Sequence, residues 1–266
     1  MMRKRLFGAF ALTLWATTAI GALNLISVND EVAIGRRAQQ QVRQQVPELR
    51  DTTVNRYIDN LGRRIAATAD GPRYPYSFDV ANYRDANAFA LPGGPVWVHR
   101  GLIDTAGSES QLAGVLAHEV AHIANRHAAE QISKGTVANV GLGLLAALLG
   151  DGTGAQIAQL GAGFAAQATM MKFSRDDERE ADVKALQYMK RAGYDPRGMV
   201  EFLQILRAQQ GRDPGSVQTF FSSHPAPVDR VRRLQQDANR LSGGRRDSQE
   251  FQTIQRRLDR LPPAAR

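Results

Sequence analysis

The most constraining feature of the chain is His118-Glu-Val-Ala-His122, which lies in a largely apolar stretch. On a helix that turns by about 100° per residue, both imidazoles project from one face and can reach a single ion. Glu119 lies about 100° away, where its carboxylate can take a proton from a water on that ion. The chance expectation for this spacing is on the order of a few in a thousand. The segment therefore predicts a zinc ion on a buried helix.

A catalytic zinc needs a third protein ligand. His127 is near, but one straight helix would turn it to the side opposite His118. A second acidic segment begins a helix at the predicted N-cap Ser174, and its residues Glu178 and Asp182 share one face. That spacing suits one carboxylate on the metal and the other as acceptor for a ligand histidine's second ring nitrogen. The alternative is a solvated helix start whose acids favour the helix dipole.

These motifs resemble the zinc metallopeptidase family of HtpX, the type-I CAAX prenyl proteases and their soluble periplasmic relatives that police outer-membrane assembly. The resemblance also covers residues 87–94, 98–102 and 223–225, and so spans roughly residues 30 to 235. It implies that His118, His122 and Glu178 hold one Zn²⁺ per chain in a zincin of the gluzincin type. It also implies that Glu119 is the general base, while Asp182 would orient a ligand histidine.

Two further residues gain interest from the resemblance. Relatives place an asparagine near the cleft at the position of Asn87, where it could stabilise a tetrahedral intermediate. A turn-forming asparagine at a strand start explains Asn87 equally well. His224 precedes a proline, and in periplasmic members this element approaches the metal, either as a fourth ligand that silences the site or as an oxyanion stabiliser. An ordinary loop histidine is the alternative.

Hydrophobic periodicity predicts a mainly helical α+β fold with a small sheet beside the metal helix. Helices are expected at residues 31–46, 53–69, 108–132, 174 onward, 199–210 and 228 onward, and strands at 76–80, 87–91 and 96–99. The last two strands flank Pro92-Gly93-Gly94 like a hairpin, and such a strand could bind an extended polypeptide at its edge. Ser108 and Gln111 should form a capping box at the start of the metal helix.

The chain is expected to have three parts. Residues 1–26 combine a basic start with an apolar run, which predicts an export signal or, if uncleaved, an anchor. Residues 27–240 form the expected metallopeptidase domain, and residues 241–266 a basic helical tail. Within the domain, apolar segments 137–149 and 155–171 are each too short to span a bilayer and should form a buried or lid-like hairpin. The sequence has no cysteine, so the fold uses no disulfide.

The predicted export signal and the net charge limit the location and the classes of partner that we expect for the protein. An export signal places the domain in the periplasm, where nucleic acid is not an expected partner. The formal charge of +8 suits anionic lipid or, more simply, a solvated helix face. By resemblance, the protein should be an envelope zinc endopeptidase that degrades misfolded or stalled envelope proteins in extended form, with the outer-membrane assembly machinery as a possible partner. The alternative is an assembly factor or holdase with a structural or silenced zinc site.

Overall fold

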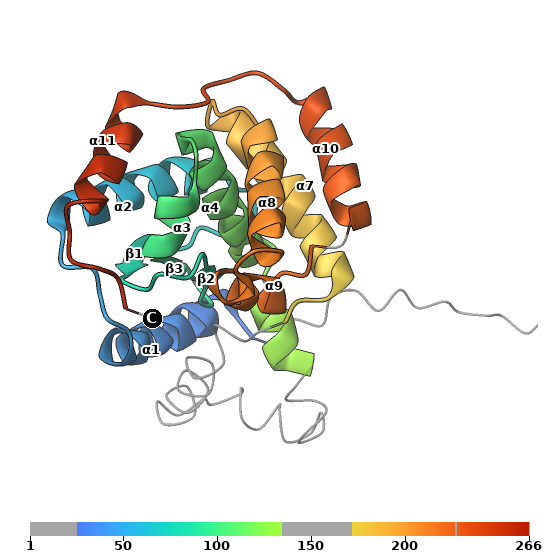
Figure 1. Cartoon of the computed structure of the whole chain (residues 1–266). Helices are drawn as coiled ribbons and strands as arrows, with labels where there is room; N and C mark the ends of the chain where they lie inside the picture. The colour runs from blue at the N-terminus through green and yellow to red at the C-terminus, as the bar shows by residue number, and fades with distance from the viewer. Residues whose placement is uncertain (1–25, 135–171, 227, 266) are drawn as a thin grey trace, which may run out of the picture.

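The structure is a computed structural model that describes residues 26–134, 172–226 and 228–265 (Figure 1). Most of the predicted export signal and the whole predicted apolar hairpin at 137–171 lie outside these residues. In the described part of the chain, no helix has the length and apolarity that a bilayer crossing requires.

Helices dominate, and a small sheet accompanies them. The helices are α1 (Val28–Gln45), α2 (Thr52–Ala66), α3 (Arg100–Thr105), α4 (Glu109–Ala124), α7 (Arg175–Arg191), α8 (Arg197–Gln210), α9 (Gln218–Ser223), α10 (Val228–Arg240) and α11 (Gln249–Leu258). The strands are β1 (Ser77–Ala81), β2 (Ala88–Ala90) and β3 (Pro95–His99). The mainly helical α+β fold expected from the sequence is confirmed.

The sheet has the order β1-β3-β2. β2 and β3 pair antiparallel as the predicted hairpin, with Phe89 opposite Trp97, whereas β1 runs parallel to β3. The turn between β2 and β3 needs glycine, because Gly93 and Gly94 have φ values of 72° and 130°. All five residues of the central strand β3 are buried. β2 is therefore an edge strand, and it contacts α4.

Helix α4 forms the centre of the molecule. All its residues from Glu109 to Ala124 are buried, as its apolar sequence predicts. It packs against α2, α7, α8 and β2, and Figure 1 shows it enclosed by them. The approach to α8 is close, since a Cβ at Gly114 would lie 2.7 Å from the Cα of Met199. Side chains on α4 are consequently held on every side by secondary structure.

Two predictions about α4 are wrong. Its helix ends at Ala124 rather than near residue 132, because Arg126 adopts a left-handed conformation with φ 62° and a separate helical segment follows at 127–134. Ser108 is the N-cap, but its side chain makes no capping bond. Instead the side chain of Gln111 accepts a hydrogen bond from the backbone N–H of Gly107 at 2.7 Å.

The C-terminal helix α11 packs onto the main core. Phe251, Ile254 and Leu258 are buried in the same apolar cluster as α2 and α4. The Phe251 ring lies 6.3 Å from that of Tyr57, centroid to centroid. The buried Arg100 donates to the Leu258 carbonyl at 2.7 Å. The tail predicted for residues 241–266 thus shares the core of the domain, and a functional boundary at residue 240 stays a prediction.

We expect Phe251→Ala to lower the free energy of unfolding by about 3–5 kcal/mol, because it leaves a cavity in the shared core. Gln252→Ala, at the exposed neighbouring position, should change it by about 0.5 kcal/mol or less. Urea unfolding of both variants measures the difference. Equal stability of the two would show that α11 adds nothing to the core.

Candidate metal centre

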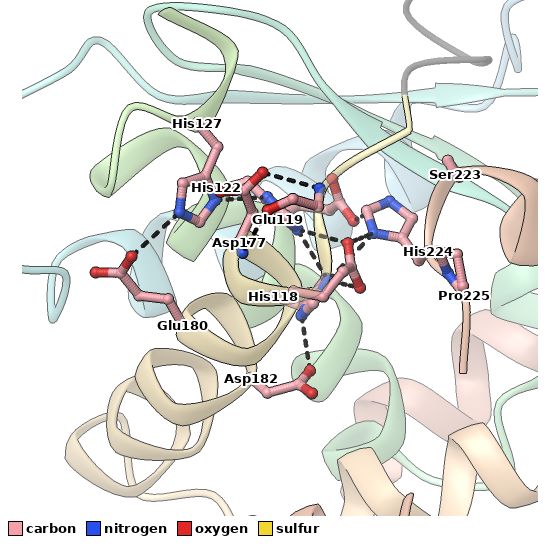
Figure 2. Close-up of polar contacts among 12 residues, drawn as sticks. His118, Glu119, His122, His127, Asp177, Glu180, Asp182, Ser223, His224 and Pro225 are labelled. Carbon is pink, nitrogen blue, oxygen red and sulfur yellow. Dashed lines mark hydrogen bonds and ion pairs between the residues drawn. The ribbon is translucent and has the colours of Figure 1, made fainter. Parts of the chain in front are cut away.

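Four side chains from distant parts of the chain meet inside the molecule. Figure 2 shows His118 and His122 on α4 and His224 at the C-terminal end of α9. The fourth side chain, Glu178, comes from α7. One possible ligand atom of each lies within 4.8 Å of the other three. No member of this cluster is more than 3% exposed. The contact between α4 and α7 thus brings together the two motifs that lie about fifty residues apart in the sequence.

The separations within the cluster fit a small tetrahedral ion. His118 Nε2 lies 3.0 Å from His122 Nε2 and 3.6 Å from Glu178 Oε2. His224 Nδ1 lies 2.9 Å from Glu178 Oε1 and 3.2 Å from His118 Nε2. Ligands bound to zinc at about 2.0–2.2 Å would be about 3.3 Å apart in a tetrahedral arrangement. Ring nitrogens and a carboxylate are also the donors that zinc prefers, so the residues fit this metal.

The start of α7 is built as predicted. Ser174 is the N-cap, and its hydroxyl accepts from the backbone of Asp177 while the Asp177 carboxylate accepts from the backbone of Ser174. This capping box fixes the first turn of α7, from which Glu178 projects toward α4. Asp182 follows one turn later, and its Oδ1 lies 3.3 Å from His118 Nδ1.

Glu119 lies beside the cluster. Its side chain is fully buried on α4, and its Oε1 is 3.5 Å from His224 Nε2. Burial raises the pKa of the Glu119 carboxyl group, because charge is costly away from water. The arrangement therefore places a basic carboxylate next to, but outside, the group of four.

The pKa values of the clustered side chains are shifted in different directions. Burial alone would raise the pKa of Glu178, but His224, His118 and His122 outweigh it and hold that pKa well below its usual range. Burial lowers the pKa of the His122 ring well below its ordinary value. Burial also acts to lower the pKa of His118, yet its bonds to Asp182 and Glu178 raise it to about 9.

Arg230 is an important residue that the sequence did not reveal. From α10, its guanidinium donates two hydrogen bonds of 2.7 Å to Asp182 and also pairs with Glu178. It donates a further bond of 2.8 Å to the carbonyl of Pro225, next to His224. The sequence around Arg230 does not predict its contact with Asp182, because the two residues are 48 positions apart in the chain. The positive charge of this buried guanidinium offsets the negative charges of Glu178 and Asp182.

His127 lies differently from its predicted place. The break after Ala124 turns it back, so that its Nδ1 is 2.8 Å from the Nδ1 of His122. The straight helix assumed from the sequence does not exist at this point, and the prediction that His127 points away is wrong. Phe173 covers the other face of His122, with ring centroids 3.9 Å apart. His127 nevertheless stays outside the group of four.

Asn87 is fully buried directly before β2. Its backbone carbonyl accepts from His99, which continues the sheet pairing. Neither polar atom of its side-chain amide has a hydrogen-bond partner among the described residues. A role for Asn87 in catalysis stays a prediction.

A cavity of about 680 Å³ adjoins the cluster between α7 and α10. Glu178, Asp182 and Arg230 line its inner end, while Phe173 and Phe221 add apolar surface. Of the four clustered side chains, Glu178 alone lines this cavity, so the cavity meets the centre at α7.

Comparison with known proteins identifies the class to which this fold and cluster belong. Residues 52–238 match the family model described as peptidase family M48. This match covers most of the chain and includes His118, His122, Glu178 and His224. The chain belongs to peptidase family M48, and the metallopeptidase family expected from the sequence motifs is confirmed.

Several curated relatives cover the same region. The beta-barrel assembly-enhancing protease of Yersinia pestis is 34% identical over 229 residues, which are 84% of this chain and 46% of the relative. The mitochondrial metalloendopeptidase OMA1 of Schizosaccharomyces pombe is 31% identical over 80% of this chain and 62% of its own length. The metalloprotease YcaL of Escherichia coli is 29% identical over 70% and 67%. The chain spans about half the length of the first of these relatives.

We expect Arg230→Leu to cost about 3–5 kcal/mol of stability in metal-free protein, because it leaves two buried carboxylates without their cation. Arg233→Leu removes an ion pair with Asp229 in which both side chains are more than half exposed, so it should cost about 1 kcal/mol or less. Denaturant unfolding in the presence of a chelator tests this. Similar losses in both variants would contradict a central role for Arg230.

Proposed function

We propose that this protein is a zinc-dependent endopeptidase of the cell envelope that degrades misfolded or stalled envelope proteins. The observation that carries the proposal is the convergence of His118, His122 and Glu178, with Glu119 beside them, in a member of peptidase family M48. These three ligands would hold one zinc ion per chain. When bound, the metal would polarise the scissile carbonyl and make an adjacent water easier to deprotonate.

The residues of the chain would divide the remaining work. Glu119 would take the proton from the water and pass it to the leaving amine, as its place beside the ligands allows. Asp182 would hold the His118 ring through Nδ1, from which it lies 3.3 Å. The buried amide of Asn87, which has no side-chain partner in the described structure, would stabilise negative charge on the substrate.

Substrates would be unfolded or extended polypeptides. The edge strand β2 lies against α4 and pairs with β3 alone among the described strands, so its other edge would receive an extended polypeptide. The name of the Yersinia pestis relative suggests outer-membrane proteins as clients and the assembly machinery as a possible partner. The periplasm is the proposed location, because the sequence predicts export. Anionic lipid remains a further proposed contact for the basic surface.

We assign His224 the fourth position at the metal in the resting state. Its ring lies within the cluster and is 1% exposed, so it occupies the place that a water or a substrate carbonyl would need. This same observation favours the second candidate function, an assembly factor or holdase whose zinc site is silenced. In that case the cleft would bind polypeptides without cutting them.

Glu119→Gln should retain zinc yet lose cleavage of an unfolded casein-type substrate by about 100- to 10,000-fold, since the amide cannot accept the proton. Glu250→Gln, at an exposed site on α11, should behave as wild type. Zinc content and cleavage are measured together with protection of an unfolded client from aggregation. Retained cleavage would remove Glu119 as base. Protection by a wild type that never cleaves would favour the holdase.

His224→Ala should release zinc faster and raise the rate of cleavage, because it removes a ligand that blocks the open position. Ser222→Ala, two residues earlier and exposed, is the matched control. A fall in cleavage of about 100- to 1,000-fold with unchanged zinc binding would assign His224 to oxyanion stabilisation instead. No change in either quantity would exclude both roles.

A further inference from the structure

The break between α4 and the following helical segment is held in place by an ion pair. Arg126 is the one non-glycine residue with a positive φ in the described part of the chain, a conformation that costs free energy for an L-residue. Its guanidinium contacts the buried carboxylate of Glu31 on α1 and the carbonyl of Ile26. The Tyr74 hydroxyl also donates to Glu31, at 2.7 Å. Several contacts from outside α4 thus maintain the turn.

The consequence of the break is the position of His127. Its ring is 2% exposed and lies 4.9 Å from that of His122, centroid to centroid, at 73° between the ring planes. The two Nδ1 atoms are 2.8 Å apart. The Nε2 atom of His127 points the other way and lies 3.5 Å from Oε2 of Glu180, which is exposed on α7 (Figure 2).

The placement of protons follows from these contacts and from the proposed zinc site. His122 Nε2 faces the cluster, 3.0 Å from His118 Nε2 and 3.4 Å from Glu178 Oε1. A neutral imidazole that ligates a metal through Nε2 carries its proton on Nδ1. His122 Nδ1 must then donate to His127 Nδ1. The ring proton of His127 is consequently on Nε2, where it faces the Glu180 carboxylate.

We propose that His127 is a positioning residue that fixes the tautomer and ring orientation of His122 for metal binding, with Glu180 as the outer end of the chain of contacts. His118 has a carboxylate, Asp182, at the same place. A neutral ring behind His122 gives the second ligand its acceptor without adding another buried negative charge to Glu178 and Asp182. This inference rests on the proposed zinc site.

Two substitutions separate positioning from packing. In His127→Asn, the side-chain oxygen can lie near the place of Nδ1 and accept the proton of His122, whereas His127→Leu fills the space without an acceptor. We expect zinc transfer to a colorimetric chelator to be about 10- to 100-fold faster from His127→Leu than from the wild type. For His127→Asn, the transfer rate should lie within about threefold of the wild-type rate. His99→Asn changes a buried histidine outside the cluster and should leave the rate unchanged. Thermal melting of the metal-free proteins reports on folding.

The proton positions are tested without any variant, which keeps the proposal falsifiable if His127→Leu does not fold. Nitrogen-15 NMR of the zinc-loaded wild type should show the proton of His122 on Nδ1 and that of His127 on Nε2. A proton on His127 Nδ1 would overturn the proposal. Zinc release at the wild-type rate from both variants would also overturn it. Equally faster zinc release from both variants, together with lowered melting temperatures, would overturn it as well. If the wild type bound no zinc, the proposed function itself would fail, which is a distinct outcome.

Discussion

The structure depends on how the charge of two buried carboxylates is balanced. Glu178 and Asp182 lie one turn apart on α7, and each is less than 5% exposed. Ions in such surroundings lose several kcal/mol of hydration, which only close partners can return. Arg230 reaches both carboxylates, and His118 and His122 of α4 together with His224 contact them as well. The helices α4, α7 and α10 are thereby joined at one point by electrostatic complementarity as well as by apolar packing.

The rest of the fold keeps these side chains buried and rigid. α4 has no exposed face, because α2, α7, α8 and the sheet surround it. Its side chains therefore have few alternative rotamers, and the imidazoles of His118 and His122 stay directed toward α7. The short edge strand β2 lies along the same helix, and two of its three residues are buried. The small sheet thus helps to enclose the side of α4 that carries the clustered histidines.

The sequence predicted the parts of the centre that depend on local spacing. Histidines four residues apart, and Glu178 and Asp182 four residues apart, share helix faces whatever the tertiary structure, and each motif begins or lies within a strong helix pattern. The family resemblance joined the two motifs and added His224. Arg230 was missed because an arginine on an amphipathic helix is ordinary, and only the packing of α10 against α7 gives it partners.

The break at Arg126 shows a second limit of local patterns. Residues 111–132 read as one helix, since they contain no proline and their single glycine, Gly114, lies far from the break. The left-handed turn is favoured by Glu31, which is 95 residues away in the chain, so no window around Arg126 contains the cause. Because the expected straight helix placed His127 on the side opposite His118, the contact between His127 and His122 was not predicted. Short elements such as α3 and α9 were missed for a simpler reason, since six residues are too few for helical periodicity to be recognised.

Access to the centre and the balance of charge are linked through Arg230. The guanidinium that pairs with Glu178 and Asp182 also donates to the carbonyl of Pro225, directly after His224. A displacement of the backbone at His224 and Pro225 would therefore break that bond or carry Arg230 with it. In the second case Glu178 loses both Arg230 and His224, and its close polar partners are then the rings of His118 and His122. If His224 holds the fourth position at the metal, the same displacement would also break a metal–ligand bond, so opening should cost more with the metal bound than without it.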